Sequence, residues 1–191
     1  MEVNLHKLSS LALVIRIVRE GTERLAEYEA VPISFEVRAR LSLPALKIGR
    51  FVEDPVDPFV KDYDASEPDR PTLLPGRLGA DRLVVLSAYR NEDRVGGAIL
   101  YFPSDDEAQL VDLRVHPSAR RIGLGRRLVQ SALSEVSHRG IPTLEIETQD
   151  TNVAACRFYH SLGASLVWIE PNGYPGFSDE AKLVWSLPSG M

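Results

Sequence analysis

Hydrophobic and polar positions follow a regular pattern in the second half of the chain. Two apolar runs, Arg82–Arg90 and Arg94–Phe102, are separated by the polar residues Asn91–Asp93, which is typical of a β-hairpin. Glu107–Val115 has the composition of a further strand and is followed by His-Pro, which blocks its continuation. Ile122–Val136 then carries apolar residues at helical spacing. These patterns predict three strands followed by an amphipathic helix.

The same kind of pattern continues toward the end of the chain. A helix is predicted to begin at Asp150 or Thr151, both suited to an N-cap, and to end at Leu162 before a glycine. Strands are predicted on either side of this helix, at Thr143–Thr148, Ser165–Glu170 and Ala181–Leu187. The order strand-strand-strand-helix-strand-helix-strand-strand predicts an α/β fold in which helices flank a mixed sheet.

The first half of the chain is less regular. It predicts a strand at Leu11–Val18, a short polar helix at Thr22–Ala30 and a further strand at Ile33–Leu43. Asp54–Ala80 contains five of the thirteen prolines and six acidic residues, so we expect a long loop there. The chain has 191 residues, and we expect residues 1–191 to form one domain that includes this loop.

Composition narrows the classes of function. The formal net charge is −5 and the pI is about 5.4, which disfavours a general nucleic-acid binder. One cysteine and four histidines offer little material for a metal site, so no metal is expected. The apolar N-terminal stretch is broken by Arg16 and is too short to span a bilayer. We therefore expect a cytoplasmic protein, and a homodimer is compatible with the sequence.

The segment Leu113–Gly125 combines features that suit an anion. A strand ends, a proline follows, and a basic turn with two glycines opens a helix, whose first N–H groups have no partner within the helix. Glycine allows the backbone to approach a phosphate closely. Four arginines add positive charge at positions 120, 121, 126 and 127. The alternative is an ordinary helix start with surface arginines.

Two motifs in this half of the chain resemble those of the GNAT N-acetyltransferase superfamily. Arg120-x-x-Gly123-x-Gly125 after a strand resembles its acetyl-CoA pyrophosphate loop, and the segment Asn152–Tyr159 resembles its second motif. Pro55–Tyr63 and Glu147–Cys156 are further similar to streptothricin (nourseothricin) acetyltransferases. The resemblance implies a GNAT-like, mostly antiparallel mixed sheet with splayed central strands.

The resemblance also implies which residues bind acetyl-CoA, the expected cofactor. The strand backbone at Leu113 and Val115 would pair with the pantetheine arm and polarise the thioester. Asn152 would bond the same arm, and Phe158 would pack against it. The pyrophosphate would be held by the loop and first helical turn, namely Arg120, Arg121, Ile122, Gly123, Leu124, Gly125 and Arg126.

Catalytic roles follow from the same comparison. Tyr159 matches the residue that commonly protonates the departing thiolate, whereas the alternative is a core tyrosine on an apolar helix stripe. A base is expected near the strand ends, and Asp112 and Glu147 are the candidates, also for binding the substrate ammonium. Asp112 could equally be a solvent-facing strand residue. Relatives tend to carry a carboxylate where this chain has Val111.

The implied activity is acetyl transfer from acetyl-CoA to a primary amine of a small cationic substrate, such as a streptothricin-type antibiotic. Two alternatives stay open at this point. One is a protein or peptide N-acetyltransferase, which needs an open groove. The other is a non-catalytic acetyl-CoA-binding sensor domain, which the departure at Val111 leaves open.

Overall fold

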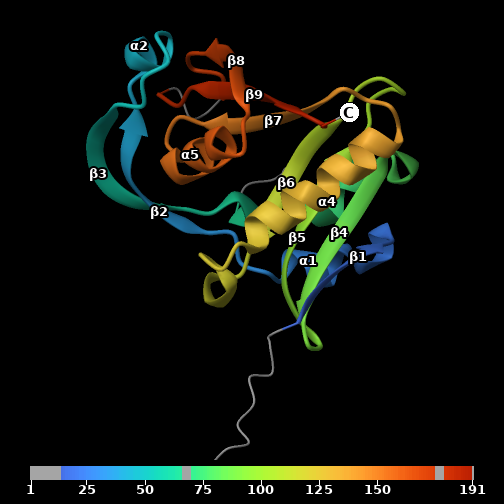
Figure 1. Ribbon diagram of the computed structural model, residues 1–191. Helices are drawn as coiled ribbons and strands as arrows, with labels where there is room; N and C mark the ends of the chain where they lie inside the picture. Colours follow the sequence, from blue (N-terminus) through green and yellow to red (C-terminus); the bar gives the residue numbers. More distant parts are fainter. Residues whose placement is uncertain (1–13, 66–69, 175–178, 191) are drawn as a thin grey trace, which may run out of the picture.

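The computed structural model describes residues 14–65, 70–174 and 179–190, and its centre is a seven-stranded sheet (Figure 1). The strand order is β1-β4-β5-β6-β7-β9-β8. The neighbouring strands are antiparallel except β6 and β7, which run parallel. The predicted mixed, mostly antiparallel sheet is therefore confirmed. The strands are β1 (Ile15–Glu20), β4 (Leu83–Arg90), β5 (Asp93–Tyr101), β6 (Gln109–Val115), β7 (Thr143–Gln149), β8 (Ser165–Glu170) and β9 (Lys182–Pro188).

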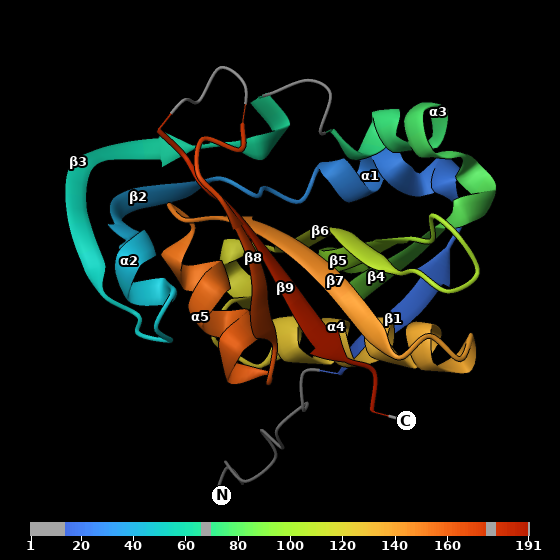
Figure 2. The ribbon, with the colours of Figure 1, turned by 90° about the horizontal axis from the view of Figure 1, so that it is seen from above.

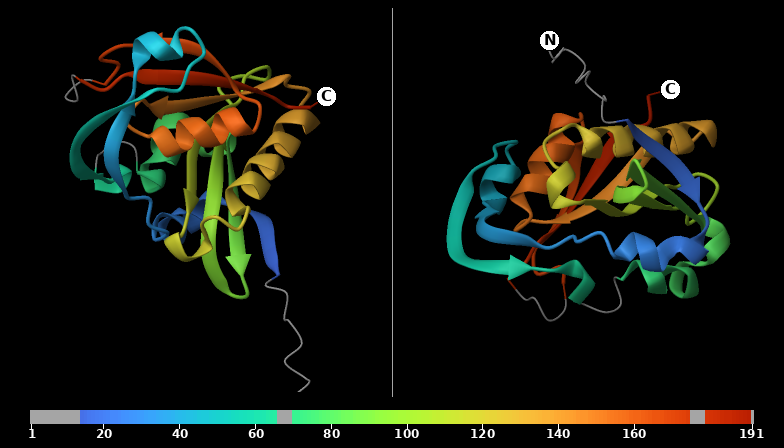
Figure 3. Two further views of the ribbon diagram at one scale, coloured as in Figure 1. Left: turned by 60° about the vertical axis from the view of Figure 1, so that its left-hand side comes forward. Right: turned by 90° about the horizontal axis from the view of Figure 1, so that it is seen from below.

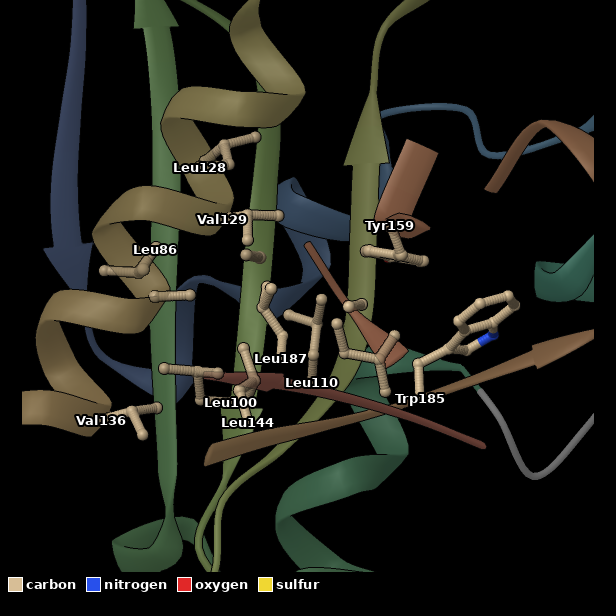
Figure 4. Packing of buried hydrophobic residues seen from close by; sticks show 14 of the residues in the cluster. Leu86, Leu100, Leu110, Leu128, Val129, Val136, Leu144, Tyr159, Trp185 and Leu187 are labelled. Atoms are coloured by element: carbon tan, nitrogen blue, oxygen red, sulfur yellow. The ribbon is translucent and has the colours of Figure 1, made fainter. Parts of the chain in front are cut away.

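Helices cover both faces of this sheet (Figure 2). α4 (Leu124–His138) packs on one face, and α1 (Leu25–Glu29) and α3 (Leu74–Leu78) lie on the other. α5 (Val153–Ser161) begins shortly after β7 and contributes to the core on the α4 side. Figure 4 shows this core, in which leucine and valine side chains of α4 meet residues of five strands. Burial of an apolar stripe thus explains why the predicted helix forms.

The segment expected to be a long loop is largely ordered structure, so that prediction is wrong. β3 (Glu53–Lys61) pairs antiparallel with β2 (Phe35–Leu41), and the short helix α2 (Leu43–Leu46) lies between them. Pro55 and Pro58 are tolerated because β3 is paired on one edge only. A missing N–H costs little on the unpaired edge of such a strand. Figures 1 and 3 show this β2–β3 ribbon on the far side of α5 from α4.

The remainder of that segment also forms short elements. A 3-10 turn at Tyr63–Ala65 follows β3, and another at Pro71–Leu73 leads into α3. Residues 66–69 lie outside the described residues. Glu29 at the end of α1 accepts hydrogen bonds from the backbone and hydroxyl of Thr72, at 3.1 and 2.7 Å, so this connection is packed against α1.

The N-terminal predictions are partly tested. β1 begins at Ile15, whereas residues 11–13 of the predicted strand lie outside the described part of the chain. The predicted polar helix is a 3-10 turn, Thr22–Arg24, followed by α1. Among the described residues, no helix is both long and apolar enough to cross a membrane. The cytoplasmic location and the homodimer stay predictions.

Gly97 on β5 is expected to be irreplaceable for packing reasons. A Cβ there would lie 2.3 Å from Cε2 of Tyr28 and 2.6 Å from the carbonyl oxygen of Leu86. Because backbone cannot move aside cheaply, Gly97→Ala should lower the free energy of unfolding by about 1–3 kcal/mol in urea melts. Gly76→Ala in α3 is the control. A Cβ added at Gly76 would meet no atom within 4 Å, so this change should be neutral or stabilising. Equal stability of the two variants would contradict this packing.

Candidate active site

The two parallel strands at the centre of the sheet separate soon after they meet. β6 and β7 pair only at Gln109 with Glu145 and at Leu110 with Ile146. At that point β6 also changes register against β5, which leaves Val111 as a bulge. We call the diverging segments, residues 111–115 of β6 and 147–149 of β7, the β6–β7 fork. It confirms the predicted splay of the central strands.

Beyond the bulge at Val111, the side chains of β6 alternate between the two faces of the sheet. Leu113 and Val115 pack with the core on the α4 side, whereas Asp112 and Arg114 contact residues on the α1 side. The fork therefore presents side chains on both faces of the sheet. The carbonyl of Val115 accepts a hydrogen bond from Nε of Arg120 at 3.0 Å, a contact that the sequence did not predict.

The predicted pyrophosphate loop, residues 120–126, which we call the anion loop, is open to solvent at the start of α4. Arg121 and Gly123 both have a positive φ, of 65° and 85°, which turns the backbone into the helix. A Cβ built on Gly123 would meet no atom within 4 Å, so the loop backbone is accessible. Arg121, Ile122 and Arg126 are also exposed. Because the first N–H groups of a helix lack helical partners, this end of α4 suits a phosphate.

Three residues in the first turn of α4 contact the rest of the protein. Leu124 is 1% exposed and its side chain belongs to the core, so that side chain cannot contact a ligand. Arg127 is not part of a free patch, because its Nη2 donates to the carbonyl of Ile15 at 2.7 Å. Gly125 provides close packing: a Cβ there would lie 3.3 Å from the ring of Phe158.

Asn152 begins α5 and is held at both ends of its side-chain amide. Its Oδ1 accepts from the N–H of Ala155 at 3.1 Å, which is an N-cap, and its Nδ2 donates to the hydroxyl of Tyr63 at 3.2 Å. The expectation that Asn152 bonds a pantetheine arm therefore competes with these two contacts. Its position is fixed by the helix and by the end of the β2–β3 ribbon.

Tyr159 lies on α5 and points toward β6, as Figure 4 shows. The residue is 6% exposed, and no hydrogen-bond partner of its hydroxyl lies among the residues that the structure describes. Burial raises the pKa of Tyr159 well above its usual range, and the negative charge of Asp112 raises it further. The phenol therefore stays protonated at neutral pH.

Asp112 does not fit the predicted role of base. Its carboxylate accepts from Nε and Nη2 of Arg114, at 3.0 and 2.6 Å, and from the hydroxyl of Tyr28 at 2.6 Å. The side chains of Asp112 and Arg114 are 8% and 0% exposed. A carboxylate held by three donors in a buried ion pair is poorly placed to take a proton from a substrate. The alternative of a solvent-facing strand residue is wrong as well.

Glu147 remains the carboxylate with access to the fork. It alternates along β7 with buried residues of the α4-side core, so its side chain projects to the α1 face, and about half of that side chain is exposed. Oε1 accepts from the hydroxyl of Tyr174 at 2.8 Å, and Oε2 lies 3.5 Å from Nζ of Lys182. These contacts orient the carboxylate without burying it.

Sequence reasoning missed the residues that support this site. Arg114 is the charged centre of the α1 side of β6, and Tyr63, Asp64 and Tyr174 reach the fork from distant segments. A signal for Arg114 was present: Asp112 and Arg114 are two residues apart on a strand, so they share a face and can form an ion pair. Tyr63 ends the stretch Pro55–Tyr63 that resembles streptothricin acetyltransferases, but nothing in the neighbouring sequence assigns a role to Tyr63, Asp64 or Tyr174.

Comparison with known proteins agrees with this geometry. The model of the acetyltransferase (GNAT) family matches residues 49–164, which include the fork, the anion loop and α5. The chain belongs to this family. The resemblance seen in the sequence and the expected acetyltransferase class are thereby confirmed at the level of the family.

Relatives within the family act on different acceptors, according to their names. [Ribosomal protein bS18]-alanine N-acetyltransferase of Escherichia coli K12 is 38% identical over 87 residues, or 45% of this chain and 59% of that protein. The match thus covers less than two thirds of that relative's length. A Bacillus anthracis protein assigned as a streptothricin acetyltransferase, in complex with acetyl coenzyme A, has a TM-score of 0.75 at 26% identity and covers 92% of this chain and 98% of its own. A nourseothricin acetyltransferase, at 24% identity and a TM-score of 0.73 over the same shares of the two chains, shows the same fold.

The single cysteine should be inert in the folded protein. Cys156 is fully buried, and burial raises the pKa of its thiol to about 12. Because the thiolate is the reactive form, native protein at pH 8 should react with a thiol-specific reagent at least 100-fold more slowly than the unfolded chain. The unfolded chain should consume one equivalent of the reagent, since it has one cysteine. Rapid modification of the native protein would contradict the buried, structural role.

Proposed function

We propose that the chain is an acetyl-CoA-dependent N-acetyltransferase that acetylates a primary amine of a small cationic molecule. The observation that carries this proposal is the position of Tyr159. Its protonated phenol lies beside β6 at the fork, and α5, which carries it, packs against the first turn of α4 through Phe158 and Gly125. A proton donor and an anion-binding loop are thus supported by the same two helices.

The residues present fit acetyl-CoA. Backbone N–H groups at the start of α4, the open Gly123 and the exposed Arg121 and Arg126 would hold the pyrophosphate. The edge of β6 beyond Leu110 has no partner strand on the β7 side among the described residues, so its backbone groups can bond an extended arm. When bound, acetyl-CoA supplies the acetyl group as a thioester.

The chain's own residues divide the chemistry between the two faces of the sheet. On the α4 side, Tyr159, which is protonated at neutral pH, donates its proton to the departing thiolate. The backbone of β6 near the bulge at Val111 is suited to donate a hydrogen bond to a carbonyl oxygen. On the α1 side, Glu147 holds the amine and accepts its proton, directly or through water.

Charge at the fork supports a cationic acceptor. Two carboxylates, Asp112 and Asp64, share the single guanidinium of Arg114, which leaves one negative charge beside the fork. Glu147 adds a second carboxylate on the same face, partly offset by Lys182. A protonated amine approaching from the α1 side is therefore attracted. The likeness to the Bacillus anthracis protein, which extends over nearly the whole chain, supports a streptothricin-type antibiotic as the acceptor.

A peptide amine is the second candidate, because the Escherichia coli relative at 38% identity is named for an alanine of a ribosomal protein. The β2–β3 ribbon argues against it. The 3-10 turn that ends the ribbon contacts both strands of the fork, through Asp64 to Arg114 and through Tyr63 to Gln149. A peptide chain would need this approach to be open, whereas a small amine would not.

The acceptor class is tested by release of free CoA thiol from acetyl-CoA with a panel of amines. We expect turnover with streptothricin or polyamines, and at least tenfold lower kcat/KM with a peptide that has a free N-terminal alanine. The reverse ranking would favour the peptide reading. No turnover with any amine, together with a raised melting temperature in acetyl-CoA, would leave the non-catalytic sensor as the function.

Gly123 should be required for acetyl-CoA binding because its backbone must lie against the pyrophosphate. Gly123→Ala places a methyl group there and should raise the Kd, measured by calorimetry, tenfold or more. Gly140→Ala is a matched control, since Gly140 also has a positive φ, of 73° against 85°, and open space around its Cα, but lies beyond the other end of α4. Both variants should lose similar stability; similar losses of affinity would refute the loop assignment.

Tyr159→Phe removes only the proposed proton donor. It should lower kcat about 100-fold, as expected for loss of a general acid, and leave the Kd of acetyl-CoA within about twofold. In the wild-type enzyme the raised pKa of Tyr159 predicts that kcat does not fall through ionisation of this phenol up to about pH 10. Equal losses of kcat and affinity would instead indicate a packing role for the tyrosine.

A further inference from the structure

One short turn contacts both strands of the β6–β7 fork. In the 3-10 turn Tyr63–Ala65, the carboxylate of Asp64 accepts two hydrogen bonds from Arg114 of β6, each 3.0 Å long. The hydroxyl of the preceding residue, Tyr63, donates to Oε1 of Gln149, the last residue of β7. Two adjacent residues therefore bind the two strands that diverge. We refer to them as the Tyr63–Asp64 clasp.

Both contacts of the clasp are partly buried. The side chains of Arg114 and Asp64 are 0% and 22% exposed, so their paired hydrogen bonds are little screened by water. The ring of Tyr63 packs against Phe35 of β2, with centroids 5.7 Å apart. Removing Asp64 would break two charge-assisted hydrogen bonds, whereas Arg114 would keep those to Asp112 and to the carbonyls of Glu29 and Val31.

The clasp is also anchored outside the fork. Nζ of Lys61, at the end of β3, lies 2.6 and 2.5 Å from the two carboxylate oxygens of Glu180. Oε1 of Glu180 in turn accepts from the hydroxyl of Thr151 at 2.8 Å. The turn is therefore attached to the ribbon, to the segment before β9 and to the start of α5, and it can hold the fork at a fixed width.

We propose that the Tyr63–Asp64 clasp sets the separation of β6 and β7 at the fork, and that Tyr63 and Asp64 are positioning residues for acetyl transfer. This inference rests on the proposed function, since the separation matters only if the reacting groups meet at the fork. It extends that function, because the end of the β2–β3 ribbon would then position the reacting groups.

The contacts of Tyr63 explain how the clasp reaches the reacting groups. Its hydroxyl also accepts from Nδ2 of Asn152, and Asn152 caps the helix that carries Tyr159. The clasp thereby fixes the start of α5 relative to β6. An ångström of misplacement between a proton donor and its target costs one to two orders of magnitude in rate, so the clasp should act on kcat. The pyrophosphate loop is not contacted and should bind as before.

Hydrogen exchange of the ligand-free protein tests the mechanical part of the proposal. Tyr63→Phe keeps the ring, and Asp64→Asn keeps the shape of the side chain. Since both residues share one turn, each variant should raise amide exchange at least tenfold on both strands of the fork, including the strand that the altered residue does not touch. An increase confined to the contacted strand would overturn the clasp, because the two contacts would then be independent.

Steady-state kinetics test its effect on the reaction. Each single variant should lower kcat about tenfold, and Asp64→Asn, whose altered side chain contacts Arg114 and no residue expected to bind acetyl-CoA, should leave the Kd of acetyl-CoA unchanged. The double variant should be no worse than the poorer single variant, because either change opens the same clasp. Additive losses, or unchanged kcat in both variants, would contradict the proposal. If the wild-type protein turns over no amine, the proposed function fails, whereas the exchange result still decides whether the clasp exists.

Tyr89→Phe provides a matched control for a purely structural loss. Tyr89 lies on β4, two strands away from β6. Its hydroxyl donates to Glu20 at 2.7 Å and accepts from Nη2 of Arg94 at 2.7 Å. This variant should lower the melting temperature as much as Tyr63→Phe while leaving kcat and exchange at the fork unchanged. Equal kinetic effects in the two variants would show that lost stability alone explains the loss of rate.

Discussion

The arrangement of this protein depends on two parallel strands that stay hydrogen-bonded over only two residue pairs, Gln109 with Glu145 and Leu110 with Ile146. A sheet normally satisfies the backbone groups of each inner strand on both sides. Here β6 turns away from β7 at the bulge of Val111, so the backbone groups on that side need other partners, as the carbonyl of Val115 has in Arg120. A ligand with an extended polar arm can supply them. The unsatisfied edge of β6 is thus the physical basis of the proposed site.

The surrounding elements stabilise this interruption of the sheet. On one face, α4 and α5 meet through Gly125 and Phe158 and place Tyr159 beside β6. On the other face, Arg114 joins β6 to α1 and to the end of the β2–β3 ribbon. The two faces therefore carry different chemistry: the proposed proton donor and the proposed anion loop lie on one face, and the carboxylates lie on the other. Reactants that approach from opposite faces can meet only at the fork.

Local patterns predicted the regular elements well, because burial on one face of a strand or helix leaves a period in the sequence. They failed between residues 54 and 80, since prolines that normally indicate a loop are compatible with an edge strand. Site residues that belong to contiguous motifs, such as Gly123 and Tyr159, could be named from the sequence. The role of Asp112 could not, because its partners Tyr28 and Arg114 are brought to it by folding, and neither Tyr63 nor Asp64 lies near another site residue in the chain.

A crystal structure of the protein with coenzyme A bound is the most direct test of the account. It should place the pyrophosphate against the N–H groups at the start of α4 and the pantetheine arm along the free edge of β6. The sulfur should lie in the β6–β7 fork within about 3.5 Å of the hydroxyl of Tyr159, as a proton transfer requires. A sulfur bound outside the fork, or a Tyr159 hydroxyl directed away from it, would contradict the account.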